Sequence, residues 1–234
     1  MISLNNVSKA FGGLTAVRDL SLSIAPGEIF GLVGPNGAGK TTTLRMMTGL
    51  LIPDTGQIRF GEYDIVREPL RAKASFGYVP DRPFLYEKLT ARELLSFVAS
   101  LYGVGRGPAI EASGRLLHLF GISDVGDELI EGFSQGMRQR LLFASALVHD
   151  PRALLIDEPF IGLDPFGIRT LKEIIRDLSS KGMSIFLATH SLHIAEEICH
   201  RVGFINKGVL VTIKAREELR EIEGGLEGFF LRMG

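Results

Sequence analysis

The sequence has 234 residues, of which 45% are hydrophobic and 23% are charged, and its formal net charge is -1. This composition is ordinary for a packed globular protein and excludes a largely disordered chain. The 26 basic and 27 acidic residues nearly cancel, so the chain has no overall positive field that would hold nucleic acid or an anionic membrane nonspecifically.

Cysteine usage and hydropathy indicate the compartment. The single cysteine, Cys199, cannot form an internal disulfide, and residues 1–10 alternate apolar and polar side chains instead of forming a secretory leader. The longest nearly apolar stretch, residues 141–148, is far shorter than the roughly 20 residues that cross a bilayer. We therefore expect a protein of the reducing cytoplasm, which lies beside a membrane if it serves one.

Two kinds of strand are predicted along the chain. Residues 2–11 and 17–24 alternate apolar and polar side chains, which is typical of half-buried antiparallel strands. Residues 29–33, 153–156 and 184–188 are almost continuously apolar, as strands buried on both faces of a parallel sheet must be. The chain should therefore combine an antiparallel layer with a parallel core.

Helices are predicted between the apolar strands at 29–33 and 153–156. Residues 90–102 form a helical pattern that a capping box of Thr90 and Glu93 opens, and residues 136–149 form another. No repeat or linker divides the sequence, so residues 1–234 are expected to form one domain with a helical insertion at about 83–150. The predicted fold is α/β, with a mostly parallel sheet, an antiparallel β layer at its amino-terminal side and an inserted helical lobe.

A phosphate-binding motif follows the strand at residues 29–33. Residues 34–41, GPNGAGKT, are a complete G-x-x-x-x-G-K-[ST] (Walker A) pattern, and a helix-compatible segment follows at 42–50. Glycines let backbone N–H groups curl around a phosphate, and the helix directs its positive end at the same anion. A glycine-rich turn with a surface lysine is the alternative interpretation. The motif predicts a P-loop NTPase core whose nucleotide-binding residues are Gly34, Asn36, Gly37, Ala38, Gly39, Lys40, Thr41 and Thr42.

Each charged or hydroxylated group has an expected task in ATP binding and hydrolysis. Lys40 should neutralise the β and γ phosphates, and the Thr41 hydroxyl should bind Mg²⁺. Asp157 and Glu158 follow the strand at 153–156, at the edge where open α/β sheets bind their ligands. Asp157 suits a contact to Mg²⁺, and Glu158 suits orienting or deprotonating the attacking water. Adjacent acids at a strand end are often only solvated, but the phosphate-binding loop favours the catalytic interpretation.

In order and spacing these motifs resemble the nucleotide-binding domains of ATP-binding-cassette (ABC) proteins, over essentially the whole chain. The resemblance implies that the adenine ring stacks on Phe11, with Val17 beside it, although Phe11 could instead be a core residue. His190, at the end of the strand that begins at 184, matches the family's switch histidine. Its imidazole is then expected to contact the γ-phosphate and to steady the attacking water.

Two further segments are similar to family motifs that meet a second subunit. Residues 133–137, FSQGM, resemble the signature LSGGQ, although Gln135 and Met137 replace its usual glycine and glutamine. Ser134 can cap the helix that begins beside Gly136. Taken alone, the segment is an ordinary helix start. The resemblance implies that Ser134, Gln135 and Gly136 contact the ATP of the partner subunit, and that Asp164 belongs to a loop at the dimer interface and caps the next helix.

Asp81 departs from the family pattern. In the segment 76–83, FGYVPDRP, it stands where the family usually has the glutamine that reaches Mg²⁺ and water and links the site to the transmembrane partner. A carboxylate can bind Mg²⁺, but an ionised one cannot donate the hydrogen bond of an amide. The expected Mg²⁺ ligands are therefore Thr41, Asp157 and Asp81, with an ordinary loop acid as the alternative for Asp81. His193 and His200 are expected on the next helix without a role, and Cys199 as a small buried hydrophobe.

The resemblance implies the ATPase subunit of an ABC transporter. ATP binding would close a homodimer, or a dimer with a paired ABC subunit, and hydrolysis would reopen it and drive a separate transmembrane subunit at the cytoplasmic face of the membrane. The Asp81 loop and the ending at residues 226–231, LEGFFL, are similar to ABC-2-type exporters. Importer cassettes more often continue into a regulatory domain. Export is therefore expected over import.

Two other functions are less consistent with the sequence. A non-transport ABC ATPase that acts on nucleic acid or ribosomes usually has two cassettes or a long coiled coil, whereas this chain has one cassette, no heptad run and no basic cluster. A small-molecule kinase would lack the Ser134 segment and the switch histidine. Direct nucleic-acid binding is therefore not expected, and the cargo cannot be read from this chain.

Overall fold

The computed structural model describes residues 1–82, 84–160, 163–220 and 228. Its strands are β1 (Ile2–Phe11), β2 (Leu14–Ile24), β3 (Ile29–Val33), β4 (Thr55–Phe60), β5 (Tyr63–Asp64), β6 (Phe76–Val79), β7 (Ala153–Asp157), β8 (Ser184–Thr189), β9 (Arg201–Asn206) and β10 (Val209–Ala215). Its helices are α1 (Lys40–Met47), α2 (Pro69–Ala74), α3 (Ala91–Leu101), α4 (Arg106–Leu119), the 3-10 helix η1 (Ile130–Gly132), α5 (Gln135–Leu147), α6 (Pro165–Ser180), α7 (Leu192–Ile198) and α8 (Arg216–Arg220).

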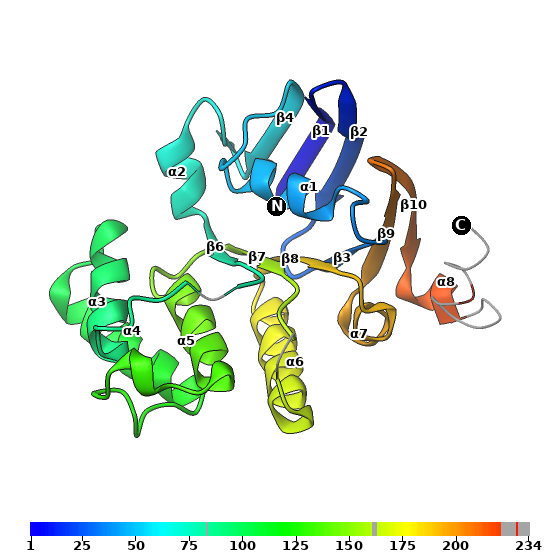
Figure 1. Ribbon diagram of the computed structural model, residues 1–234. Coiled ribbons are helices and arrows are strands. Elements are labelled where there is room, and N and C mark those ends of the chain that lie inside the picture. The colour runs from blue at the N-terminus through cyan, green and yellow to red at the C-terminus, as the bar shows by residue number, and fades with distance from the viewer. Residues whose placement is uncertain (83, 161–162, 221–227, 229–234) are drawn as a thin grey trace.

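The sheet has an antiparallel part and a parallel part, as predicted. Its order is β5-β4-β1-β2-β10-β9-β3-β8-β7-β6. β1 pairs antiparallel with β2 and β4, whereas β3, β6, β7, β8 and β9 run parallel to their neighbours within that group. Figure 1 shows the antiparallel strands standing above the parallel ones, with α1 between them and α6 below.

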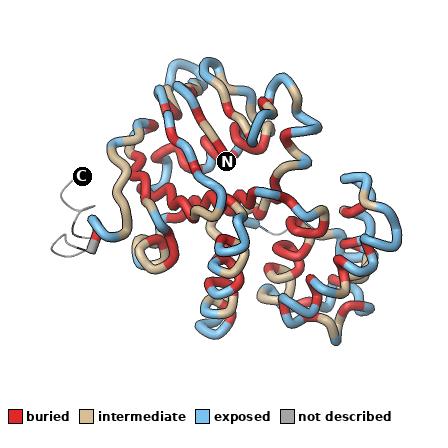
Figure 2. Tube along the Cα trace, turned by 180° about the vertical axis from the view of Figure 1, so that it is seen from behind, coloured by how far each residue is buried: buried red, intermediate tan, exposed pale blue. Residues whose placement is uncertain are grey.

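Burial follows the two predicted hydropathy patterns. Every residue of β3, β7 and β8 is buried, whereas buried and exposed residues are mixed along β1 and β2. In Figure 2 buried residues gather along the parallel strands in the middle of the molecule. A strand covered on both faces has no exposed side to fill with polar residues, which explains its continuous apolar run.

The segment between β6 and β7 forms the helices α3, α4, η1 and α5, which lie together at one side of the sheet (Figure 1). The predicted capping box opens α3: Thr90 Oγ1 accepts the Glu93 N–H at 3.1 Å, and the Glu93 carboxylate accepts the Thr90 N–H at 2.8 Å. The sequence analysis did not locate α4, because its first turn contains Gly107 and Pro108, residues that usually mark a turn.

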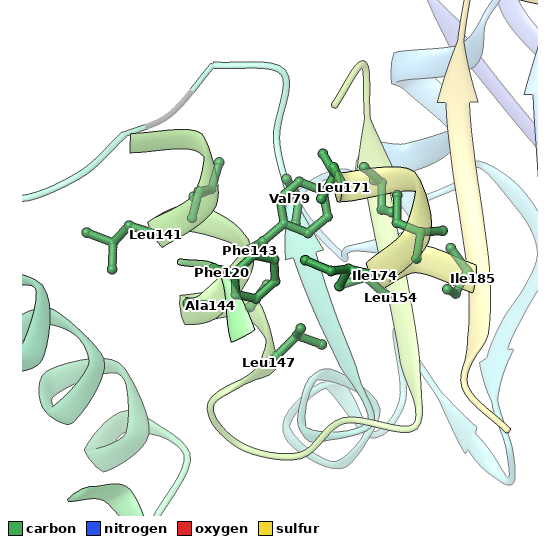
Figure 3. Packing of buried hydrophobic residues seen from close by; sticks show 14 of the residues in the cluster. Val79, Phe120, Leu141, Phe143, Ala144, Leu147, Leu154, Leu171, Ile174 and Ile185 are labelled. Carbon is green, nitrogen blue, oxygen red and sulfur yellow. The ribbon is translucent and has the colours of Figure 1, made fainter. Parts of the chain in front are cut away.

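The helices pack tightly on the parallel strands. Phe143 of α5 lies among Val79 of β6 and Leu171 and Ile174 of α6 in one buried cluster (Figure 3). At Gly77, in β6, a side-chain carbon would lie 2.1 Å from the carbonyl oxygen of Ala146, so α5 approaches β6 to a distance that only glycine permits. This packing anchors the strand that leads to Asp81.

Some local predictions need correction. The helix after the phosphate-binding loop ends at Met47 instead of reaching residue 50, because Gly49 adopts a left-handed conformation with φ of 68°. His200 lies beyond the end of α7, where its Nδ1 accepts the Ile29 N–H at 2.9 Å. Cys199 is buried, as expected.

In the described part of the chain, no helix combines the length and apolarity needed to cross a membrane.

Candidate functional site

A cavity of about 380 Å³ lies where the carboxyl ends of the parallel strands meet the start of α1. It brings together the phosphate-binding loop, the acid pair after β7, the histidine after β8 and the acid after β6, because β3, β8, β7 and β6 are successive neighbours in the sheet. Its lining residues are Ala16, Asn36, Gly37, Gly39, Lys40, Thr41, Thr42, Asp81, Asp157, Glu158 and His190.

Glycines shape the loop between β3 and α1. Gly37 and Gly39 have φ angles of 79° and 113°, which are unfavourable for other residues. A side-chain carbon at Gly39 would lie 2.7 Å from the Ala16 carbonyl oxygen, and one at Gly34 would lie 2.2 Å from that of Ile205. The loop therefore lies directly against neighbouring backbone. No side chain caps the first turn of α1, so its N–H groups remain available to an anion at the cavity.

Lys40 supplies a positive charge at this loop. Its side chain is 7% exposed, and its Nζ donates hydrogen bonds to the carbonyl oxygens of Gly34 at 2.7 Å and Pro35 at 3.1 Å. Burial lowers the pKa of the Lys40 ammonium, and the carboxylates of Glu158 and Asp157 oppose that shift. A buried cation between a glycine loop and two acids suits a phosphate group.

Asp157, the last residue of β7, is almost fully buried, and its Oδ2 has no hydrogen-bond partner. Burial raises the pKa of Asp157 to about 6, and the charges of Asp81 and Glu158 add to this shift. Lys40 and the Thr41 hydroxyl oppose it. An unpartnered carboxylate oxygen beside a hydroxyl and a second acid offers the oxygen ligands that Mg²⁺ prefers.

This set of oxygens fits Mg²⁺ better than a cation that needs a full protein cage. Within the residues that the structure describes, no three His, Cys, Asp or Glu side chains form a metal-binding group. Mg²⁺ usually takes only one or two protein carboxylates and completes its shell with waters and substrate phosphates. Thr41, Asp157 and Asp81 match that requirement.

Glu158, which also lines the cavity, is held firmly by its neighbours. Its φ of 45° is unusual for a residue with a side chain, and its N–H donates to the Ala188 carbonyl oxygen at 3.0 Å. Oε2 accepts the Thr189 hydroxyl at 2.9 Å, while Oε1 accepts the His190 N–H at 2.8 Å and lies 2.7 Å from His190 Nδ1. His190 therefore contacts Glu158 itself, a pairing that the sequence analysis did not predict.

The two residues expected at the adenine ring, Phe11 and Val17, differ in exposure. Phe11 is 49% exposed, with Lys9 Nζ 5.7 Å from the ring centroid, so it is available for stacking and is not a core residue. Val17 is fully buried, whereas Ala16 lines the cavity. Successive side chains of a strand point to opposite faces, and β2 turns Val17 inward. A nucleotide in this cavity would therefore meet Ala16 in place of Val17.

The predicted helix caps are present. The Ser134 hydroxyl accepts the Met137 N–H at 3.3 Å at the start of α5, and the Asp164 carboxylate accepts the Gly167 N–H at 2.6 Å at the start of α6. Ser134, Gln135, Gly136 and Asp164 do not line the cavity. Ala38 is buried behind the loop. Gly162, two residues before Asp164, lies outside the described residues.

Gln139 was missed by sequence analysis. It is 3% exposed, and its Nε2 donates to the Pro159 carbonyl oxygen at 3.2 Å, so it ties α5 to the loop that follows Glu158. A polar residue inside an otherwise apolar helical face is the signal that could have identified it, because a buried amide requires a partner.

The fold and the cavity define a P-loop protein that binds nucleoside triphosphate at the edge of a mostly parallel sheet. Residues 17–161 match the family model described as ABC transporter. The chain is 38% identical over 225 residues to the linearmycin resistance ATP-binding protein LnrL of Bacillus subtilis (strain 168), covering 96% of this chain and 72% of that protein.

Two further comparisons agree. The chain is 41% identical over 226 residues to the Nod factor export ATP-binding protein I of Paraburkholderia xenovorans (strain LB400), covering 97% of this chain and 74% of that protein. A solved structure of the ATP binding subunit of an ABC transporter superposes with a TM-score of 0.91 at 30% identity, over 100% of this chain and 99% of the other. The chain therefore belongs to the ABC transporter family and is the ATP-binding subunit, an ATPase, of such a transporter. This confirms the resemblance that the sequence motifs indicated.

Proposed function

We propose that this subunit hydrolyses ATP in the cavity and thereby powers export through a separate transmembrane subunit. The observation that carries the proposal is the placement of a firmly held Glu158 carboxylate and the Lys40 ammonium in one cavity beside a glycine loop. Such an arrangement can bind the phosphates on one side and a water molecule on the other.

The residues divide the reaction between them. The loop and Lys40 hold the phosphates, and Phe11 and Ala16 accommodate the adenine. The water oxygen bonds to the γ-phosphorus as the bond from that phosphorus to the bridging oxygen of ADP breaks, and Glu158 takes a proton from the water. When bound, Mg²⁺ neutralises charge on the β and γ phosphates, and Thr41, Asp157 and Asp81 are the residues that would hold it.

His190 supports this step through Glu158. Because its Nδ1 lies against the carboxylate, only Nε2 remains for a phosphate oxygen or the water. A phosphate oxygen is an acceptor, so that contact requires a hydrogen on Nε2. The side chain of His190 is 56% exposed at the cavity, which leaves room for this second contact.

A second subunit is proposed to complete the site. Ser134 and Gln135 are exposed at the capped start of α5 and lie outside this chain's own cavity, as does Asp164. A helix start with free N–H groups favours a phosphate oxygen. These residues, with Gly136, therefore suit the ATP of a partner copy, in a homodimer or with a paired ABC subunit.

The proposal of export rests on similar proteins, one of which is named for Nod factor export and one for linearmycin resistance. The similarity of residues 226–231 to exporters cannot be followed in the structure, because of these residues only Gly228 is described. The subunit would then work at the cytoplasmic face of the membrane. A nucleic-acid or ribosome ATPase of the same family is the alternative, and the net charge of -1 disfavours it.

Exposed aromatic rings between β6 and the end of α3 offer a contact for the transmembrane subunit. Phe84 and Tyr86, 83% and 53% exposed, follow Asp81 in the chain. The ring of Tyr86 packs edge to face with Phe84 at 6.3 Å and with Phe97 of α3 at 5.7 Å between centroids. Exposed aromatic clusters mark interaction surfaces, and this one includes rings that follow Asp81, a residue of the cavity, in the chain.

Purification from the native membrane tests the partner and this surface together. We expect the tagged chain to retain a polytopic membrane protein, and the double variant Phe84→Ser, Phe97→Ser to lose most of it while binding ATP normally. Leu70→Ser, at an 84% exposed position on α2, is the matched control and should retain the partner. Equal recovery of the membrane protein with the parent, the double variant and Leu70→Ser would show that the aromatic cluster does not contact the transmembrane subunit.

Asp81 gives a test of the proposed Mg²⁺ set. Its charge already acts on Asp157, since it contributes to the raised pKa of that carboxyl. We expect Asp81→Ala to raise the Mg²⁺ concentration for half-maximal hydrolysis several-fold, and Asp81→Gln to restore much of the activity through its carbonyl oxygen. Magnesium titrations of steady-state phosphate release measure both. Identical curves for the parent and Asp81→Ala would show that Asp81 is only a loop acid.

A further inference from the structure

Thr189, the last residue of β8, contacts the carboxylate that is proposed to act as the base. It is 1% exposed, and its Oγ1 lies 2.9 Å from Glu158 Oε2. The same Oγ1 accepts the Ser191 N–H at 3.0 Å. The parallel register between β7 and β8 produces this contact. Asp157 lies opposite Ala188, so the residues that follow them in the chain, Glu158 and Thr189, also lie close together.

The hydrogen bonds fix the direction of the threonine hydroxyl. A hydroxyl has one hydrogen, an ionised carboxylate has none, and the Ser191 N–H must donate. The hydrogen of Thr189 therefore points to Glu158 Oε2. This is a charge-assisted hydrogen bond in a buried place, which is stronger than a bond between neutral groups.

The remaining contacts of Glu158 show what this bond accomplishes. A carboxylate has about four acceptor positions, two on each oxygen. The backbone N–H and Nδ1 of His190 occupy those of Oε1, and Thr189 occupies one on Oε2. One position, on Oε2, is left for a water molecule.

We propose that Thr189 is a positioning residue, which fixes the Glu158 carboxylate so that the free position on Oε2 faces the attacking water. The proposal rests on the proposed role of Glu158 as the base. The last torsion of a glutamate side chain is soft, and rotation about it displaces both carboxylate oxygens. His190 restrains Oε1, and the bond from Thr189 adds a restraint on Oε2, the oxygen that is to face the water.

Substitutions at Thr189 separate the hydrogen bond from the shape of the side chain. Thr189→Val keeps the branching and loses the hydrogen, so we expect kcat to fall about tenfold or more while the KM for ATP stays within about twofold. Thr189→Ser keeps the hydroxyl and should recover most of kcat. Ser184→Ala is the control, since Ser184 is a buried hydroxyl at the far end of β8, bound to the Ala25 carbonyl oxygen at 2.9 Å.

A double-mutant cycle distinguishes positioning from a structural role. In the Glu158→Gln background, Thr189→Val should lower the residual kcat by less than about twofold, because no base remains to be oriented. An equal loss in both backgrounds, or no recovery with serine, would overturn the proposal. If Thr189→Val shows no cooperative thermal unfolding transition and is therefore not folded, Thr189→Ala can replace it in the same double-mutant cycle.

The proposed function and this inference fail in different ways. If Glu158→Gln keeps full turnover, the base assignment fails, and the role of Thr189 fails with it. If Glu158→Gln loses turnover but Thr189→Val does not, only the positioning role is wrong. Nucleotide binding by each variant, measured with a fluorescent ATP analogue, confirms that the cavity itself is intact.

Discussion

Replacing Glu158 with glutamine is expected to leave ATP binding intact and to slow turnover by about two orders of magnitude or more, the usual scale for a general base. Glutamine has the same length and keeps a carbonyl oxygen for the contacts to Thr189 or His190. It cannot accept a proton from water. The binding of a fluorescent ATP analogue and the rate of phosphate release measure the two effects separately.

The same variant tests the proposed dimer. With ATP bound and hydrolysis blocked, closed dimers should accumulate, most clearly with ATP in the absence of Mg²⁺, and size-exclusion chromatography detects them. Glu173→Gln is the control, because the Glu173 side chain, on α6, is 59% exposed and its carboxylate pairs with Arg169 at 3.1 Å. Monomer alone, together with unchanged turnover, would refute both the base assignment and the ATP-dependent dimer.

Local patterns predicted the parts of the site that depend on neighbouring residues. The strand at 29–33 and its glycine motif predicted a phosphate-binding loop, and the structure places that loop at the cavity. The apolar strands predicted that Asp157, Glu158 and His190 share one edge of the sheet, because parallel strands end on the same side. Helix caps at Thr90, Ser134 and Asp164 were also readable, since a cap depends on residues three positions apart.

Contacts between distant strands could not be predicted in the same way. The bond from Thr189 to Glu158 joins residues 31 positions apart, and it depends on the register of β7 against β8. A shift of one residue would turn each side chain to the opposite face of the sheet, and local hydropathy does not specify the shift in strands that are apolar on both faces. The choice between Ala16 and Val17 at the cavity similarly depends on which face of β2 is turned inward.

Removal of the Lys40 charge is expected to abolish nucleotide binding at ordinary concentrations. Lys40 is the cation that lines the cavity, where Asp81, Asp157 and Glu158 also lie. Without it, the phosphates of ATP would enter beside three acids with no lysine to offset their charge. Mg²⁺ alone would then have to neutralise both the phosphates and the acids. Breaking a buried charge pair commonly costs about 3–5 kcal/mol, which corresponds to a loss of affinity of at least about a hundredfold.

The Lys40→Ala variant should nevertheless fold, since the lost hydrogen bonds to Gly34 and Pro35 are two contacts within a loop that glycines and backbone packing already shape. Its control is Lys181→Ala, because Lys181 is 69% exposed at the end of α6 and pairs with Asp177. Equilibrium binding of a fluorescent ATP analogue, with thermal unfolding to confirm folding, measures the effect. Normal ATP affinity in folded Lys40→Ala would exclude the loop at 34–41 as the phosphate site, and every catalytic role assigned around it would then need another nucleotide position.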